Sequence, residues 1–177
     1  SLYVGTISPL LQKELSYAKS IKELPEDSTS EEKKILRNDL TRIRRKITNK
    51  VDDMHWKTIK FLTANHENIY IGDLSTKKVV NKEKSNLSSF MKRLTLRTNL
   101  FKFRQRLEYK SKLRGSNCKV INKYLTSKMC SNCATINKEL TTEKIFKCAQ
   151  CKKEIDRDVN GARNIYLKRY LKTSKKI

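Results

Sequence analysis

The sequence predicts an α/β chain in which long basic helices and short strands are interrupted by a small cysteine ribbon. Apolar residues recur every three or four positions over 30–64 and 87–114, which is the spacing of one helix face. Short apolar runs at 69–72 and 118–125 are typical of buried strands. Two Cys-x-x-Cys pairs stand close together in the C-terminal third of the chain.

Length and charge limit the classes of function. The chain has 177 residues, which allows one ordinary core, or a core with a small metal-stapled insert. Its net charge is +23, from 41 Lys and Arg against 18 Asp and Glu. Such an excess favours a polyanionic partner, nucleic acid first, although a solvated basic surface is the plain alternative. No apolar run approaches the ~18 residues of a membrane span, so we expect no membrane partner.

The helix over 30–64 is expected to begin with a capping box, formed by Ser28 with Glu31 or by Thr29 with Glu32. Its apolar residues should form one stripe and its basic residues the opposite face. The stripe is Leu36, Leu40, Ile43, Ile47, Val51, Met54 and Phe61. His55 and Trp56, near the end of the helix, are interpreted as packing residues.

The second helical region, 87–114, is expected to break near Thr98–Asn99 and to end at Gly115. It is strongly basic, and its cations are the candidate phosphate contacts, with a solvated face as the alternative. The candidate nucleic-acid-binding residues are Lys92, Arg93, Arg97, Lys102, Arg104, Arg106 and Lys110.

Shorter patterns fill the rest of the chain. Leu2–Gly5 is interpreted as the end of a strand, with a helix starting at Pro9. A short strand is expected at 144–147. A final helix is expected from Val159 to about Leu171, with Ala162, Ile165 and Tyr166 facing inward.

The cysteines predict a structural zinc site. Cys130, Cys133, Cys148 and Cys151 form two pairs with 14 residues between them, and two such turns across a hairpin supply a tetrahedron of thiolates. A pair of redox dithiols fits less well, because neither pair opens a helix after a strand. Cys118 is interpreted as a packing residue. This cysteine usage indicates a reducing compartment, so we expect an intracellular protein, nuclear or cytoplasmic, that is not secreted.

The acidic pair Asp156 and Asp158 directly precedes the final helix. Asp158 has two interpretations: an N-cap that accepts free amide hydrogens, or a metal ligand of a nuclease site. Asp156 is a loop acid or a second candidate for the cap.

The C-terminal motifs resemble those of the TnpB/Fanzor family, transposon-encoded RNA-guided DNA endonucleases related to type V CRISPR effectors. The resemblance rests on Thr126-Ser127-Lys128, both cysteine pairs, and Asp156-Arg157-Asp158-Val159-Asn160-Gly161-Ala162-Arg163-Asn164-Ile165. It extends more loosely over residues 40–170. The Asn160–Arg163 segment is closer to the Fanzor branch.

The resemblance implies a RuvC-like (RNase H-type) domain that cuts DNA with an Asp from the first strand, a Glu and a final Asp. Asp158 matches the final Asp. The two places where the family carries its Glu are Gly72 and Lys123 here, and residues 1–24 supply no first Asp. We therefore expect Asp158 to be a remnant metal ligand, with Mg²⁺ bound only if the nuclease site is active. DNA and a guide RNA are the implied partners.

The expected domains are a helical region with RuvC-like strands over 1–128, a zinc ribbon over 129–152, and a return to the RuvC-like domain over 153–177. The expected function is DNA binding by a zinc-containing protein that cannot cleave DNA alone. One alternative is the C-terminal part of an active RNA-guided nuclease. The other is a zinc-ribbon binding module without nuclease ancestry.

Overall fold

The computed structural model describes residues 2–73, 87–137 and 143–174. Its elements form two compact units, and each is described by itself. The first unit comprises the described residues of 1–65 and 75–110, and the second those of 66–74 and 111–177. In the described part of the chain, no helix has the length and apolar character needed to cross a membrane.

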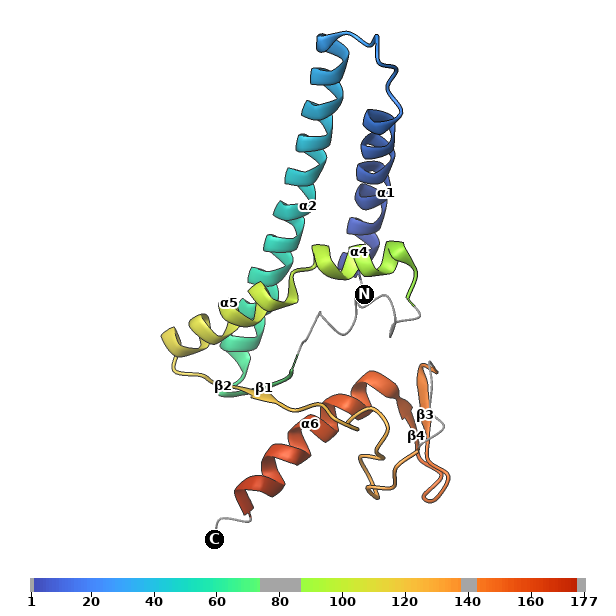
Figure 1. Cartoon of the computed structure of the whole chain (residues 1–177). Helices are drawn as coiled ribbons and strands as arrows, with labels where there is room; N and C mark the ends of the chain where they lie inside the picture. Colours follow the sequence, from blue (N-terminus) through green and yellow to red (C-terminus); the bar gives the residue numbers. More distant parts are fainter. Residues whose placement is uncertain (1, 74–86, 138–142, 175–177) are drawn as a thin grey trace. The chain divides into compact units, whose positions relative to one another are not determined.

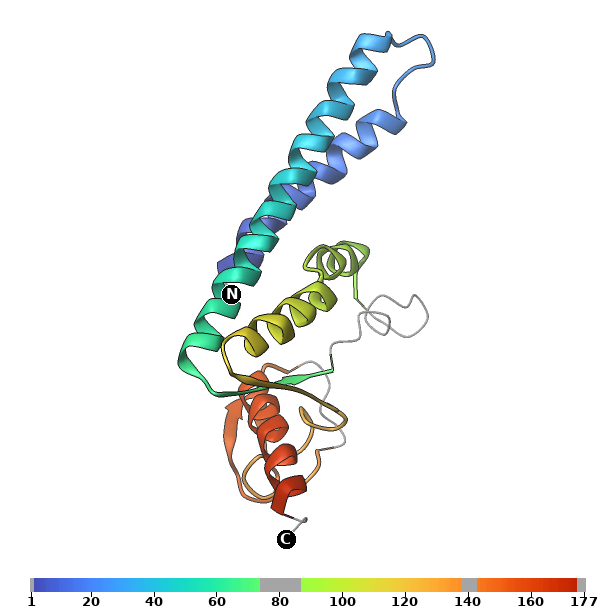
Figure 2. The ribbon, with the colours of Figure 1, turned by 90° about the vertical axis from the view of Figure 1, so that its left-hand side faces the viewer.

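The first unit is built on a hairpin of two helices, α1 (Leu2–Lys22) and α2 (Ser30–Asn65), which lie side by side in Figures 1 and 2. The predicted capping box forms with Thr29 and Glu32: the Glu32 amide donates to Thr29 Oγ1 at 3.2 Å, and the Thr29 amide donates to Glu32 Oε2 at 2.9 Å. These reciprocal bonds satisfy amide groups that a helix start leaves free. The core joins residues of α1, α2 and α4 (Ser89–Arg97), namely Ile7, Leu11, Ile43, Ile47, Val51 and Leu94.

Three expectations for this unit are wrong. Leu2–Gly5 is the first turn of α1 and not a strand. The helix therefore does not start at Pro9, which lies inside it. Phe61 is 61% exposed, because the buried stripe continues from Val51 in steps of four through His55, Ile59 and Thr63. Position 61 is two residues from Ile59, and so lies on the opposite side of the helix.

The predicted break in the second helical region is confirmed. α4 ends at Arg97 and α5 spans Leu100–Leu113, with Asn99 between them at a φ of 47°. Asn tolerates this left-handed conformation better than most residues do. Gly115, at a φ of 72°, follows the end of α5 as expected.

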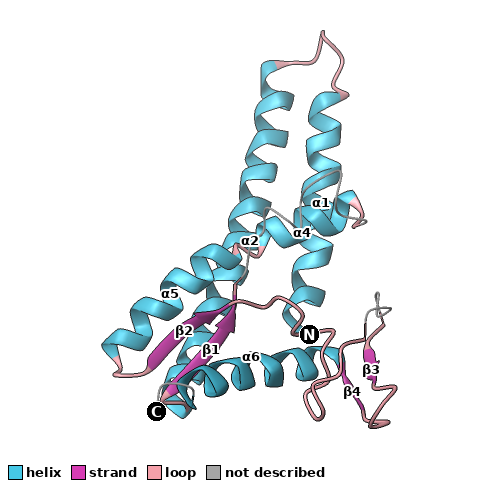
Figure 3. Cartoon of the chain, turned by 60° about the horizontal axis from the view of Figure 1, so that its bottom comes forward, coloured by secondary structure: helices cyan, strands magenta, loops and turns pink. Residues whose placement is uncertain are grey.

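The second unit contains a parallel pair of strands, β1 (Asn68–Gly72) and β2 (Asn117–Ile121), with Ile69 opposite Cys118. The helix α6 (Arg157–Ser174) contacts both strands, as Figure 3 shows. β2 ends four residues before the predicted Leu125. A separate antiparallel hairpin joins β3 (Ile145–Lys147) to β4 (Glu154–Asp156), a strand that the sequence did not predict.

The buried face of α6 differs from the expected one. Tyr166 is 55% exposed and Ala162 is also exposed, whereas Asn160 and Asn164 are fully buried. The spacing of apolar residues cannot predict this face of α6, because the side chains buried on it are the amides of two asparagines. The two asparagines stand one helical turn apart and therefore share one side of α6.

Candidate metal centre and acidic pocket

The two cysteine pairs form turns of the same geometry. The amide of Ala134 donates to the Cys130 carbonyl at 2.9 Å, and the amide of Lys152 donates to the Cys148 carbonyl at 3.0 Å. Ala134 and Lys152 each follow the first cysteine of their pair by four residues, and each has a left-handed φ, of 62° and 59°. The sequence thus builds one turn twice, and each copy presents two thiols on one side.

The four sulfur atoms converge. The Sγ atoms of Cys130, Cys133, Cys148 and Cys151 all lie within 4.8 Å of one another. Zinc–sulfur bonds of about 2.3 Å in a tetrahedron place the thiolates about 3.8 Å apart. Two of the observed Sγ separations are 3.7 Å, between Cys130 and Cys151, and 3.5 Å, between Cys133 and Cys148. The donor set and its spacing fit a metal such as zinc.

The surroundings affect the thiols unequally. Burial raises the pKa of Cys130 to about 11, because a thiolate loses hydration there. Contact with the Thr135 hydroxyl, 3.3 Å away, lowers the pKa of Cys133 to about 6. The backbone amide of Lys153 lowers the pKa of Cys151. A bound cation would favour the thiolate at every position, the buried Cys130 included.

Phe146 forms the apolar side of the ribbon. Its side chain is fully buried and clusters with Cys130 and Cys148, with Cys151 and Ile155 packed against them. Because Phe146 and Ile155 pair across the β3–β4 hairpin, the hairpin fixes the second cysteine turn. Cys118 lies in β2 and is not part of the four-sulfur cluster.

Asn160 and Asn164 fasten α6 to the first cysteine turn. Asn160 Oδ1 accepts the Ser131 amide at 3.0 Å, and its Nδ2 donates to the Met129 carbonyl at 2.8 Å. Asn164 Nδ2 donates to the carbonyls of Thr126 and Met129, at 2.8 and 2.6 Å. Sequence reasoning missed both residues as structural links. Two asparagines spaced by four in a helix were the signal that could have found them.

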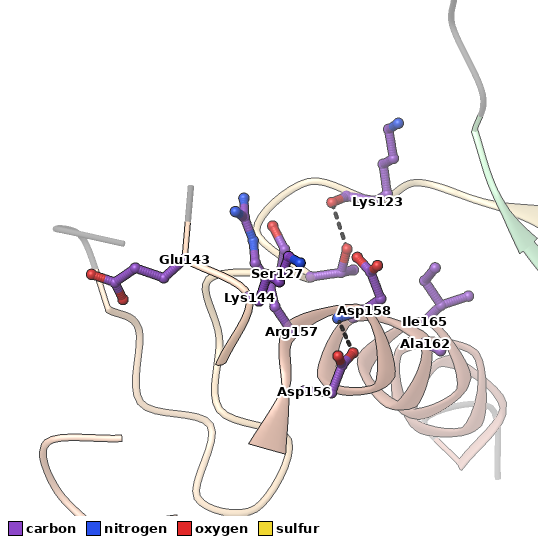
Figure 4. Close-up of a pocket in the computed structure, with 11 residues that line it drawn as sticks. Lys123, Ser127, Glu143, Lys144, Asp156, Arg157, Asp158, Ala162 and Ile165 are labelled. Carbon is purple, nitrogen blue, oxygen red and sulfur yellow. Dashed lines mark hydrogen bonds between the residues drawn. The ribbon is translucent and has the colours of Figure 1, made fainter. Parts of the chain in front are cut away.

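Asp156, and not Asp158, caps α6. Asp156 Oδ1 accepts the amides of Asp158 and Val159 at 2.8 and 3.0 Å. The interpretation of Asp158 as the N-cap is therefore wrong, because the residue two positions earlier already satisfies these amides. Asp158 is exposed in the first turn of the helix. Figure 4 shows its carboxylate turned toward the segment that carries Lys123 and Ser127, while the Lys123 ammonium points away from it.

A cavity of about 690 Å³ adjoins Asp158. Its charged lining residues are mixed: the acids Glu143, Asp156 and Asp158, and the bases Lys123, Lys144 and Arg157. Thr126, Ser127, Gly161, Ala162 and Ile165 complete the lining. The formal charges of the lining residues are therefore balanced, three acids against three bases.

The two positions at which the family resemblance expects a Glu lie against each other. A Cβ added to Gly72 would lie 3.5 Å from Lys123 Cβ and 3.3 Å from Ile165 Cδ1. Since Lys123 and Ile165 also line the cavity, the end of β1 lies close to the site of Asp158. Asp73, the next residue, is not among the lining residues; its amide donates to the Ile121 carbonyl at 3.0 Å.

The basic candidates of the first unit fall into two groups. Four of them pair with acids: Arg97 with the buried Glu14, Arg106 with Asp52 at 2.7 Å, Lys102 with Asp52 at 3.8 Å, and Arg104 with Glu108 at 3.7 Å. Lys92, Arg93 and Lys110 form no ion pair with other described residues. Glu14, which also binds Arg44 Nε at 3.0 Å, is a buried acid that sequence reasoning missed.

Arg106 is held between aromatic and polar groups. Its guanidinium lies 5.0 Å from the Trp56 ring centroid and 3.2 Å from His55 Nδ1. His55 is buried, with Nε2 2.9 Å from the Thr98 carbonyl and its ring 5.2 Å from Phe103. Burial lowers the pKa of His55. Hydrogen bonding to Arg106 lowers the pKa of Asp52. His55 is thus a packing residue, as predicted, whereas Trp56 is 42% exposed beneath Arg106.

Comparisons with known proteins agree with these motifs. Residues 101–165 match the family model "Cas12f1-like, TNB domain". Three TnpB-like proteins of Acanthamoeba polyphaga mimivirus are each 35% identical over 136 residues, or 77% of this chain. The chain spans 26% of the length of these relatives.

A solved structure shares the fold. Cas12f1, determined by cryo-EM as a complex with sgRNA and target DNA, aligns with a TM-score of 0.51 and 21% identity. The alignment covers 87% of this chain and 40% of Cas12f1. Together with the described elements it confirms the predicted α/β class, in which long helices and short strands accompany a four-cysteine cluster that fits a ribbon. The matches to the three mimivirus relatives extend well beyond the ribbon, and they show that this chain belongs to the TnpB family.

Proposed function

We propose that this chain binds nucleic acid with its basic helices, holds a structural zinc ion in its ribbon, and cannot cleave DNA by itself. The mixed charge of the cavity around Asp158 carries the last part of this proposal. Phosphodiester hydrolysis by two metal ions needs several carboxylates that converge on the ions. Of the three acids that line the cavity, Asp156 is already committed to capping α6.

The bases of the cavity count further against a two-metal site. Lys144 and Arg157 line it, and their positive charges would repel divalent cations. Asp158 would then be a remnant metal ligand. Mg²⁺ would bind only in a form of the protein that supplies further carboxylates.

Nucleic-acid binding is supported by the net charge of +23 and by cations of α4 and α5 that form no ion pair with an acid among the described residues. Lys92, Arg93 and Lys110 lie on α4 and α5 and are the best candidates for phosphate contacts. Arg97 and Arg106 are assigned instead to holding the helices together. The fold shared with Cas12f1, solved with guide RNA and target DNA, supports DNA and a guide RNA as partners.

A second candidate is the C-terminal part of an active RNA-guided nuclease. It is favoured by the exposed Asp158 carboxylate at the cavity and by the 26% of its relatives' length that this chain spans. Additional chain would then supply the missing carboxylates. Two statements stay predictions: that the chain is closer to the Fanzor branch, and that domain boundaries lie at residues 128 and 152.

Binding is tested by fluorescence anisotropy of a labelled 20-bp duplex over a range of salt concentrations. Replacing Lys92, Arg93 and Lys110 with Gln should reduce the slope of log K against log salt by about 2–3, since each phosphate contact contributes about 0.9. The control replaces Lys13, Lys22 and Lys34, three exposed cations of α1 and α2, with Gln. Equal losses in both triple variants would mean that only net charge matters.

Cleavage is tested with the same purified chain, Mg²⁺ and plasmid DNA. The proposal expects intact plasmid at salt concentrations where the duplex is bound. Robust cleavage that Asp158→Ala abolishes would overturn the proposal and establish an active site in this chain.

A further inference from the structure

Three tyrosines of the second unit form a ladder across β1 and α6. The ring centroids of Tyr70 and Tyr166 lie 6.1 Å apart at an interplanar angle of 57°. Those of Tyr166 and Tyr170 lie 6.4 Å apart at 19°, which is a stacked arrangement. Tyr166 is 55% exposed and Tyr170 is 60% exposed, so the stacked part of the ladder faces solvent. Val159, 51% exposed, lies on the same side of α6.

The ladder has basic neighbours. Lys119 stands opposite Tyr70 in the parallel strand register, and paired residues of neighbouring strands project from the same sheet face. Arg163 and Tyr166 line a hollow of about 490 Å³ together with Ser131, Ala162 and Leu167. Within α6, Asp158 is the only acid, against the bases Arg157, Arg163, Lys168, Arg169 and Lys172.

Exposed stacked rings beside cations suit single-stranded nucleic acid better than a duplex or a protein. The bases of a single strand present free π-faces to aromatic side chains, and the phosphates between them attract Lys and Arg. In a duplex the bases stack on each other, so the rings would have nothing to stack on. A protein partner would gain from the apolar area, but it would gain little from the cations unless it were acidic.

We propose that Tyr166 and Tyr170, continued by Tyr70 and flanked by Arg163 and Lys119, form a stacking platform for unpaired bases of single-stranded nucleic acid. The hollow beside Tyr166 accommodates a base, and Arg163 lies at its wall to meet a phosphate. Stacking does not read sequence, so the platform accepts unpaired DNA and RNA of any composition. The platform belongs to the second unit, whereas Lys92, Arg93 and Lys110 belong to the first.

The test measures binding of the zinc-loaded chain to labelled dT20, U20 and a 20-bp duplex. Tyr166→Ala combined with Tyr170→Ala should weaken binding to dT20 or U20 by about 5-fold to 150-fold, the range reported for losing one stacked base. Binding to the duplex should change less than twofold. Tyr166→Phe with Tyr170→Phe should bind all three probes like the wild type, because the rings remain.

The matched control is Tyr109→Ala, which removes a tyrosine that is 61% exposed on α5 and is not in the ladder. It should leave binding to dT20 and U20 unchanged. Three results would overturn the proposal: wild-type affinity of the double Ala variant for single strands, equal losses on single strands and duplex, or an equal loss in Tyr109→Ala. A wild-type chain that binds duplex but neither single strand overturns this inference alone, and one that binds no probe overturns the proposed function as well.

The alternative occupant, a second copy of the chain, is checked by light scattering. If the double Ala variant changes the oligomeric state and leaves single-strand binding intact, the ladder is a protein interface and the proposal fails. Zinc content and circular dichroism of each variant show whether it has folded. If the double Ala variant has not folded, Tyr166→Leu with Tyr170→Leu takes its place, because leucine keeps apolar bulk on α6 but removes the rings; wild-type affinity of that variant for dT20 and U20 would overturn the proposal.

Discussion

Asp156 caps the helix that carries Asp158: its Oδ1 accepts the Asp158 amide at 2.8 Å and the Val159 amide at 3.0 Å. Because of these two hydrogen bonds, Asp156 and Asp158 have different roles. Asp156 stabilises the start of α6, while the carboxylate of Asp158 stays available at the cavity (Figure 4).

The first prediction separates these roles by stability. Asp156→Ala should lower the free energy of unfolding by about 0.5–2 kcal/mol, because the two amides lose their acceptor. Asp156→Asn should recover most of this loss, since Asn also caps helices well. Asp158→Asn should change stability by less than about 0.5 kcal/mol. Urea denaturation followed by circular dichroism measures all three, and a larger loss in Asp158→Asn than in Asp156→Ala would reverse the assignment.

The second prediction concerns the metal. The purified chain should contain one zinc ion, and Cys148→Ser should lose it, because a buried cysteine of the four-sulfur cluster is replaced by a poor ligand. Cys118→Ser is the matched control and should keep its zinc. Metal analysis together with limited proteolysis of the ribbon measures both. Zinc retained in Cys148→Ser and lost in Cys118→Ser would contradict the site.

The third prediction tests the link between α6 and the first cysteine turn. Asn160→Ala leaves the Ser131 amide and the Met129 carbonyl without this partner, which should cost about 1–3 kcal/mol and speed the release of zinc to a chelator. Arg163→Ala, at an exposed position of the same helix, should leave the release rate unchanged. Equal release rates in the two variants and the wild type would show that the bonds do not support the ribbon.

The fourth prediction concerns pH. Burial lowers the pKa of His55 below its ordinary 6.5, so the unfolded chain binds a proton that the folded chain does not. Stability should therefore be complete above about pH 6.5 and should fall as the pH drops below it. The lowered pKa of Asp52 acts only near and below its ordinary 3.8, outside this window.

Thermal unfolding at pH 7.5 and pH 5.5 measures this effect. The wild type should melt at a lower temperature at pH 5.5, and His55→Gln should flatten the difference. His66→Gln, which changes the exposed histidine, should keep it. A wild-type melting temperature that is equal or higher at pH 5.5 would contradict the assignment.

Local patterns were enough for much of this fold. Reciprocal capping by Thr29 and Glu32, the break at Asn99 and the end of α5 at Gly115 all depend on a few adjacent residues. The spacing of the four cysteines alone predicts that their sulfur atoms lie close together. The prediction that Phe61 is buried was wrong, because apolar character does not determine which side of a long helix packs against other elements. His55 and Thr63 are buried on that helix instead.

The sequence by itself determined the family, the four cysteines that can bind a metal, and the basic character of the chain, since each depends only on residue identities and short spacings. Only the tertiary structure decided which side chains are already engaged. It gave the helix cap to Asp156, buried Asn160 and Asn164 against the first cysteine turn, and paired Arg97 and Arg106 with Glu14 and Asp52. These partners are separated by up to 83 residues, and no local pattern encodes a contact at that range.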